Sequence, residues 1–220
     1  MMFNNVNLSI MRKLPIIFCL LLLTGFCFSC STETTEIKKP IDFSDKILDL
    51  EDLIGVGNKV ELILEEYEFS DRETDHTTAA LKINKTLEPL IQSGKLLQKE
   101  ILSRIDLSPD NHKLSAEEIT AIKSMDRTLL AEVSLIFSSL HHNPNYPKRM
   151  DSTDNIDPIM NCISAALGIN AIYTIISSTS KLITAKEAAA IFKIVAKRYA
   201  LGYVAFGVAL YSFGRCMDYW

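Results

Sequence analysis

Residues 115–140 read SAEEITAIKSMDRTLLAEVSLIFSSL, and this stretch predicts the fold class most clearly. Its apolar residues recur at spacings of three, four and seven, which is the period of one face of an α-helix. These residues are Ile119, Ile122, Leu129, Val133, Ile136 and Leu140. Ser115, with Glu118 three residues later, forms a capping box, a pattern typical of a helix N-terminus. We therefore predict an amphipathic helix from Ser115 to Leu140.

Two more amphipathic segments precede this helix. In the first, apolar residues recur at helical spacing from Leu50 to Tyr67, and Ser44 is a candidate N-cap. The second runs from about residue 77 to 105 and contains Pro89, which should bend or split it because proline has no backbone N–H to donate. Three helices of this length favour an antiparallel bundle, here residues 43–140.

The C-terminal part is more apolar. Residues 141–158 contain three prolines and no apolar period, so we expect a loop there. Thr184 and Glu187 form a second capping box, which predicts a final helix over 185–213. We expect residues 159–220 to form an apolar helical hairpin, and the chain as a whole to be all-α.

Bulk composition excludes some function classes. The formal net charge is −4, which does not provide the basic surface that nucleic-acid binding needs. The sequence contains no nucleophile elbow, P-loop, dinucleotide fingerprint or zincin motif. We therefore expect a protein that is not an enzyme, with no catalytic residues, no cofactor and no metal, although an enzyme without a known motif stays open.

The N-terminus has the features of an export signal. Arg12 and Lys13 precede an uncharged apolar run at residues 14–28. Fifteen residues rising ~1.5 Å each span about 22 Å as a helix, less than the ~30 Å hydrocarbon core of a bilayer. This length is typical of a signal peptide and not of a membrane anchor. We predict that residues 1–29 are removed.

The residue pair at the end of this run predicts lipid attachment. Ser29 precedes Cys30, and a small residue before a cysteine resembles the lipobox of bacterial lipoproteins. Acylation of Cys30, including palmitate, would hold the chain on a bilayer. Residues 30–42 are a polar tether that begins with an acidic segment similar to those of surface lipoproteins in Bacteroidota. The expected localisation is the outer membrane of the cell envelope, on its periplasmic side or at the cell surface. An ordinary signal peptide with an incidental cysteine is the alternative.

The cysteines give a second prediction. The chain contains Cys19, Cys27, Cys30, Cys162 and Cys216, and two remain after signal removal and lipidation. Disulfides persist outside the cytoplasm, so we expect a bridge between Cys162 and Cys216. It would close a loop of about 55 residues and add ~4 kcal/mol to stability. A metal pair and two free thiols are the alternatives.

Two clusters are weak candidates for a metal site. His141 and His142 are adjacent, so they do not face one way on a helix, and no third ligand follows at helical spacing. Asp151, Asp154 and Asp157 lie three residues apart in the expected loop, without the glycine of a calcium loop. For both clusters a solvated surface is the better interpretation.

Residues 157–220 carry a resemblance to known proteins. Its motifs are Cys162-x-x-Ala165-Ala166-Leu167-Gly168, Lys193-x-x-Ala196-Lys197-Arg198-Tyr199, Gly202, Tyr211-x-Phe213-Gly214 and Cys216-Met217-x-Tyr219-Trp220. This pattern resembles the C-terminal module of small Bacteroidota lipoproteins, which implies no activity. It is also loosely similar to disulfide-closed, two-helix bacteriocins of Gram-positive bacteria, although those peptides are short and basic.

A tethered bundle and a disulfide-closed hairpin without catalytic groups leave two functions. The first is a non-catalytic interaction or structural module, held on the lipid bilayer by Cys30 and contacting a protein partner. The second is a membrane-active antagonist, or its immunity protein, that uses the hairpin. Residues 159–177 are just long enough to span a bilayer, but polar residues such as Asn161 and Asn170 weaken that stretch. The sequence favours a hairpin buried in the core.

Overall fold

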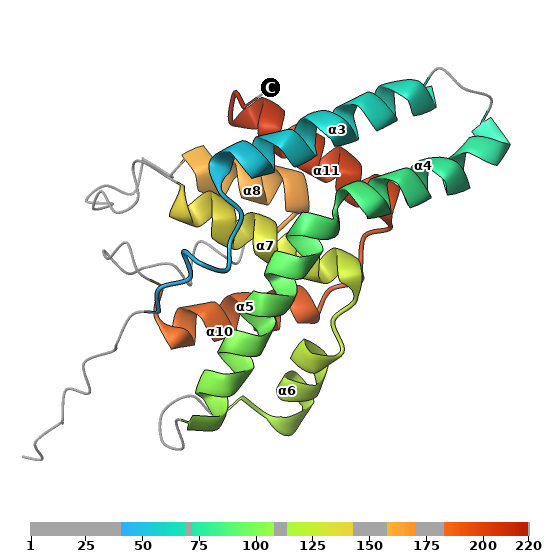
Figure 1. Cartoon of the computed structure of the whole chain (residues 1–220). Helices are drawn as coiled ribbons and strands as arrows, with labels where there is room; N and C mark the ends of the chain where they lie inside the picture. Colours follow the sequence, from blue (N-terminus) through green and yellow to red (C-terminus); the bar gives the residue numbers. More distant parts are fainter. Residues whose placement is uncertain (1–40, 69–71, 108–113, 143–157, 170–182, 220) are drawn as a thin grey trace, which may run out of the picture. The chain divides into compact units, whose positions relative to one another are not determined.

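The computed structural model describes residues 41–68, 72–107, 114–142, 158–169 and 183–219 (Figure 1). All of them belong to the compact unit Lys39–Trp220. Within these ranges the regular structure is helical, which confirms the predicted all-α class. The helices are α3 (Leu50–Glu68), α4 (Arg72–Thr86), α5 (Glu88–Leu107), α6 (Ala116–Lys123), α7 (Arg127–His141), α8 (Pro158–Leu167), α10 (Ala185–Ala196) and α11 (Tyr203–Cys216).

The segment before α3 is not helical, so the prediction of Ser44 as an N-cap is wrong. The Ile41 backbone N–H donates to the Ile183 carbonyl at 3.0 Å in an isolated antiparallel bridge. Phe43 and Leu48 are buried, and this packing holds the segment in a non-helical path. The carboxylate of Asp49 instead accepts the backbone N–H of Asp52 at 2.7 Å in the first turn of α3.

The helix predicted around Pro89 is split, as the sequence indicated. α4 ends at Thr86 and α5 begins at Glu88, with the buried Leu87 between them. Pro89 therefore lies in the first turn of α5, where a backbone N–H has no partner within the helix and its loss costs little. The two helices continue the chain in different directions (Figure 1).

The helix predicted over residues 115–140 is two helices. The capping box is confirmed, because Ser115 Oγ accepts the Glu118 N–H at 3.2 Å and Glu118 Oε2 accepts the Ser115 N–H at 3.1 Å. The chain then turns after α6, and Asp126 caps α7 by accepting the Leu129 N–H at 2.9 Å. Sequence analysis overlooked Asp126, which provides the second N-terminus.

The C-terminal helices also differ from the prediction. The capping box of Thr184 and Glu187 is confirmed at the start of α10. The helix expected over 185–213 is interrupted at residues 197–202, and α11 begins after Gly202. After this interruption the two helices have largely different neighbours: α10 packs on α5, α6 and α7, whereas α11 packs mainly on α3, α4 and α8 and only slightly on α7.

Helix α7 lies in the interior, and every residue from Thr128 to Leu140 is buried. Its most extensive neighbour is α5, which crosses it in Figure 1. The crossing depends on Gly94, since a Cβ at that position would lie 2.1 Å from the Leu130 carbonyl oxygen. The close approach of the two backbones therefore requires glycine.

Candidate functional site

Several predicted sites lie outside the described residues. They are the signal 1–29, the lipidation residue Cys30 with the tether up to residue 40, and the aspartates Asp151, Asp154 and Asp157. Predictions about them stay predictions.

Cys162 and Cys216 lie at disulfide distance, with 5.6 Å between their Cα atoms. Cys162 is buried on α8, and Cys216 is exposed at the last residue of α11. The bridge joins two helices that also pack on each other. It fastens the short helix α8 to the C-terminal end of α11.

The two histidines have separate structural positions. His141 is the last residue of α7, and burial lowers the pKa of its imidazole. His142 caps α7, and its Nε2 donates to the Leu48 carbonyl at 2.7 Å. Among the described residues, no group of three or more His, Cys, Asp or Glu side chains is placed to hold a metal ion.

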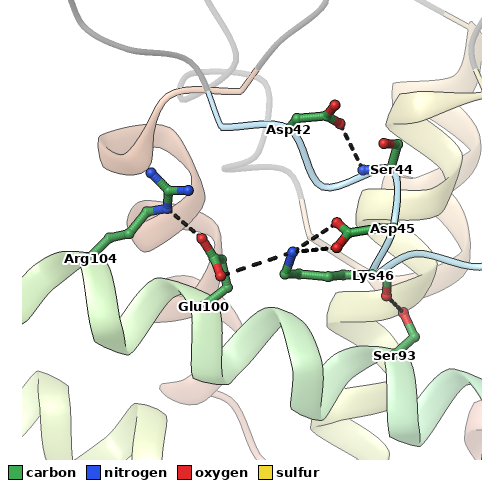
Figure 2. Close-up of polar contacts among 7 residues, drawn as sticks. All are labelled: Asp42, Ser44, Asp45, Lys46, Ser93, Glu100 and Arg104. Carbon is green, nitrogen blue, oxygen red and sulfur yellow. Dashed lines mark hydrogen bonds and ion pairs between the residues drawn. The ribbon is translucent and has the colours of Figure 1, made fainter.

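The non-helical segment before α3 is bound to α5 by polar contacts (Figure 2). Lys46 Nζ lies 2.7 Å from the Asp45 carboxylate and 4.0 Å from Glu100, which also pairs with Arg104 at 2.6 Å. The Ser93 hydroxyl donates to the Lys46 carbonyl at 2.7 Å. These contacts position the backbone. They do not bring together a nucleophile and a base.

Buried hydroxyls along α7 are also structural. The Ser134 hydroxyl donates to Ser93 Oγ at 2.7 Å, and Ser138 Oγ accepts the Leu48 N–H at 3.2 Å. The Ser139 hydroxyl donates to the Leu135 carbonyl one turn earlier. Buried polar groups in native folds are normally satisfied in this way. These serines therefore carry no sign of a catalytic site.

An ion-pair cluster joins α6 to α10. Glu118 Oε1 lies 2.6 Å from Lys193 Nζ and 3.2 Å from Lys197 Nζ. The hydrogen bond from Lys193, then the bond from the Ser115 N–H, lowers the pKa of Glu118 to about 2. This carboxylate therefore stays ionised between pH 5 and 8, and its charge does not change with pH in that range.

The most unusual group in the described structure is Glu132. It lies in the middle of α7 with 0% of its side chain exposed. Its Oε2 accepts a hydrogen bond from Arg198 at 3.2 Å, and its Oε1 has no partner in the structure. Burial raises the pKa of the carboxyl to about 7, while Arg198 lowers it and Asp126 raises it further.

Arg198 reaches this acid from the connection between α10 and α11. Its second amino group donates to the Leu167 carbonyl at the end of α8, at 2.5 Å. Gly168 follows with φ of +66°, a conformation that favours glycine. One guanidinium therefore links the 197–202 connection to both α7 and α8.

Sequence analysis missed this pair, although a signal was present. Glu132 lies three residues after Leu129 and four before Ile136, which is the spacing of the buried face of the helix. A charged residue at such a position needs a partner, which the sequence does not identify. The sequence prediction therefore named Arg198 only as part of a motif and did not connect it to Glu132.

Comparisons with known proteins give no match. No family model matches the chain, and no curated protein or solved structure shows significant similarity to it.

Proposed function

We propose that the protein is a lipid-anchored protein of the bacterial cell envelope, held on the outer membrane by Cys30, with a helical body that serves as a non-catalytic interaction or structural module. The observation that carries the proposal is the placement of Cys162 and Cys216 at disulfide distance. Disulfides persist in oxidising compartments outside the cytoplasm. This agrees with the export signal and the cysteine that follows it.

The packing of the apolar C-terminus supports a module over a membrane-active antagonist. Phe206, Leu210 and Phe213 on α11 are fully buried in the core, next to α3, α4 and α8. Insertion of α11 into a membrane would keep these side chains in an apolar environment, but it would expose to water the apolar faces of α3, α4 and α8 that they cover, which costs several kcal/mol. The described residues contain no helix long and apolar enough to span a membrane; residues 170–177 of the candidate span lie outside them.

Substitution of the lipidation residue tests the anchor. We expect Cys30→Ala to move most of the protein from the membrane fraction to the soluble fraction, because the thiol that receives the acyl chains is gone. Alkaline-washed membranes from cells that express the variant provide the measurement. Cys19→Ala is the matched control, since it removes a signal-peptide cysteine and leaves Cys30 in place. Retention of Cys30→Ala in washed membranes at the wild-type level would contradict the anchor.

A leakage assay separates the module from the antagonist. Liposomes loaded with a self-quenched dye are mixed with the mature chain without its lipid, residues 31–220, at micromolar concentration. We expect no release of the dye, because the apolar faces of α8 and α11 are buried in the hydrophobic core of the fold. Release that depends on protein concentration would support the antagonist.

A further inference from the structure

Glu132 and Arg198 have a geometry that most buried ion pairs avoid. The carboxylate is removed from solvent, yet only one of its oxygens is hydrogen-bonded. The guanidinium is 25% exposed, so it has access to water while the acid does not. A buried charge with an incomplete set of hydrogen bonds is expensive, and uptake of a proton removes that cost.

The other charged groups around α7 do not complete this site. Asp126 at the start of α7 acts on Glu132 with the same sign of charge. α8 contains no charged residue. The charged residues of the other helices that pack on α7 are exposed or half exposed, or form ion pairs or hydrogen bonds with other groups. They are Glu51, Asp52, Lys59, Glu61, Glu65 and Glu66 on α3; Glu88, Lys95, Lys99, Glu100 and Arg104 on α5; Lys186, Glu187 and Lys193 on α10; and Arg215 on α11.

We propose that Glu132 and Arg198 form a pH-operated latch between α7 and the 197–202 connection. In the closed state the ionised carboxylate of Glu132 holds the guanidinium. When Glu132 takes one proton from water, it becomes a neutral acid that no longer attracts the cation. Arg198 then keeps its bond to the Leu167 carbonyl alone, and the connection is held to α8 but not to α7.

The operating range follows from the environment of the acid. With a pKa of about 7, roughly 90% of Glu132 is ionised at pH 8 and about 99% is protonated at pH 5. Between the ordinary pKa of a glutamate and this raised value, the folded state binds the proton and the unfolded state does not. Against global unfolding, the contribution of Glu132 is therefore largest below its ordinary pKa and is lost as the pH rises to 7. The bond to Arg198 follows the opposite course, because it needs the ionised carboxylate.

Hydrogen exchange of the full chain in detergent tests the latch. After correction for the intrinsic effect of pH on amide exchange, we expect residues 197–202 to exchange roughly fivefold faster at pH 5 than at pH 8. This corresponds to replacing a charge-assisted hydrogen bond with a weaker neutral contact. In Glu132→Gln, which is uncharged at both pH values, the two corrected rates should be equal.

Glu118→Gln is the matched control. It removes another acid that binds the end of α10, but Glu118 does not titrate between pH 5 and 8. This variant should keep the wild-type dependence on pH at residues 197–202. Equal corrected rates in the wild type, or a dependence that persists in Glu132→Gln, would overturn the latch. If Glu132→Gln does not fold, corrected exchange rates of the wild type at residues 197–202 decide, because between pH 5 and 8 they must change with a single midpoint near pH 7.

Discussion

Gly94→Ala is expected to destabilise the fold by roughly 3 kcal/mol or more. The added Cβ would lie 2.1 Å from the Leu130 carbonyl oxygen and 2.6 Å from its carbonyl carbon. Both atoms belong to the backbone of the buried helix α7, so no side chain can rotate to relieve the clash. Helix α5 must separate from α7, which removes packing along the most extensive helix contact in the described structure.

The sign of this change makes it a sharp test. Helix propensity alone predicts that glycine to alanine inside a helix stabilises by up to ~1 kcal/mol. Gly55→Ala on α3 is the control, because a Cβ at position 55 would meet nothing within 4 Å apart from its chain neighbours and its own helix backbone. Urea unfolding should show Gly55→Ala at least as stable as the wild type and Gly94→Ala much less stable. Equal stability of the two variants would mean that α5 and α7 do not cross at Gly94.

Loss of the disulfide is the second large effect. Cys162→Ser is expected to lower the free energy of unfolding by ~4 kcal/mol, because the bridge closes a loop with a sequence separation of 54. The free thiol of Cys216 should then react with an alkylating reagent, since this residue is exposed. Thermal unfolding and mass spectrometry after alkylation provide the two measurements.

Reduction of the wild type gives the matched comparison. A reducing agent should lower its melting temperature to that of Cys162→Ser, and it should leave the variant unchanged. A native chain in which Cys216 is alkylated without reductant would show that the two thiols are free. In that case side-chain packing alone would hold α8 against α11.

The sequence predicted features that depend on short-range chemistry. Both capping boxes, at Ser115 and at Thr184, were correct because each is completed by a residue three positions away. The split at Pro89 follows from one missing N–H. The pairing of Cys162 with Cys216 could be predicted because only these two cysteines remain after the signal peptide and Cys30 are set aside.

Features decided by tertiary packing were missed. Residues 197–202 contain no proline, so helical periodicity gave little reason to end α10 before α11. The break lets α10 and α11 pack on largely different neighbours, which a local pattern does not show. Glu132 was missed for a related reason. Its partner Arg198 is 66 residues away, and local periodicity does not connect the two positions.

Attachment through Cys30 is tested by the mass of the native protein. Membranes from cells that express the full chain are extracted with detergent, and the mass of the intact protein is measured by mass spectrometry. We predict a chain that begins at Cys30 and carries the mass of a diacylglyceryl group and one amide-linked acyl chain. A chain that keeps residues 1–29, or one that starts elsewhere without acyl groups, would contradict the claim.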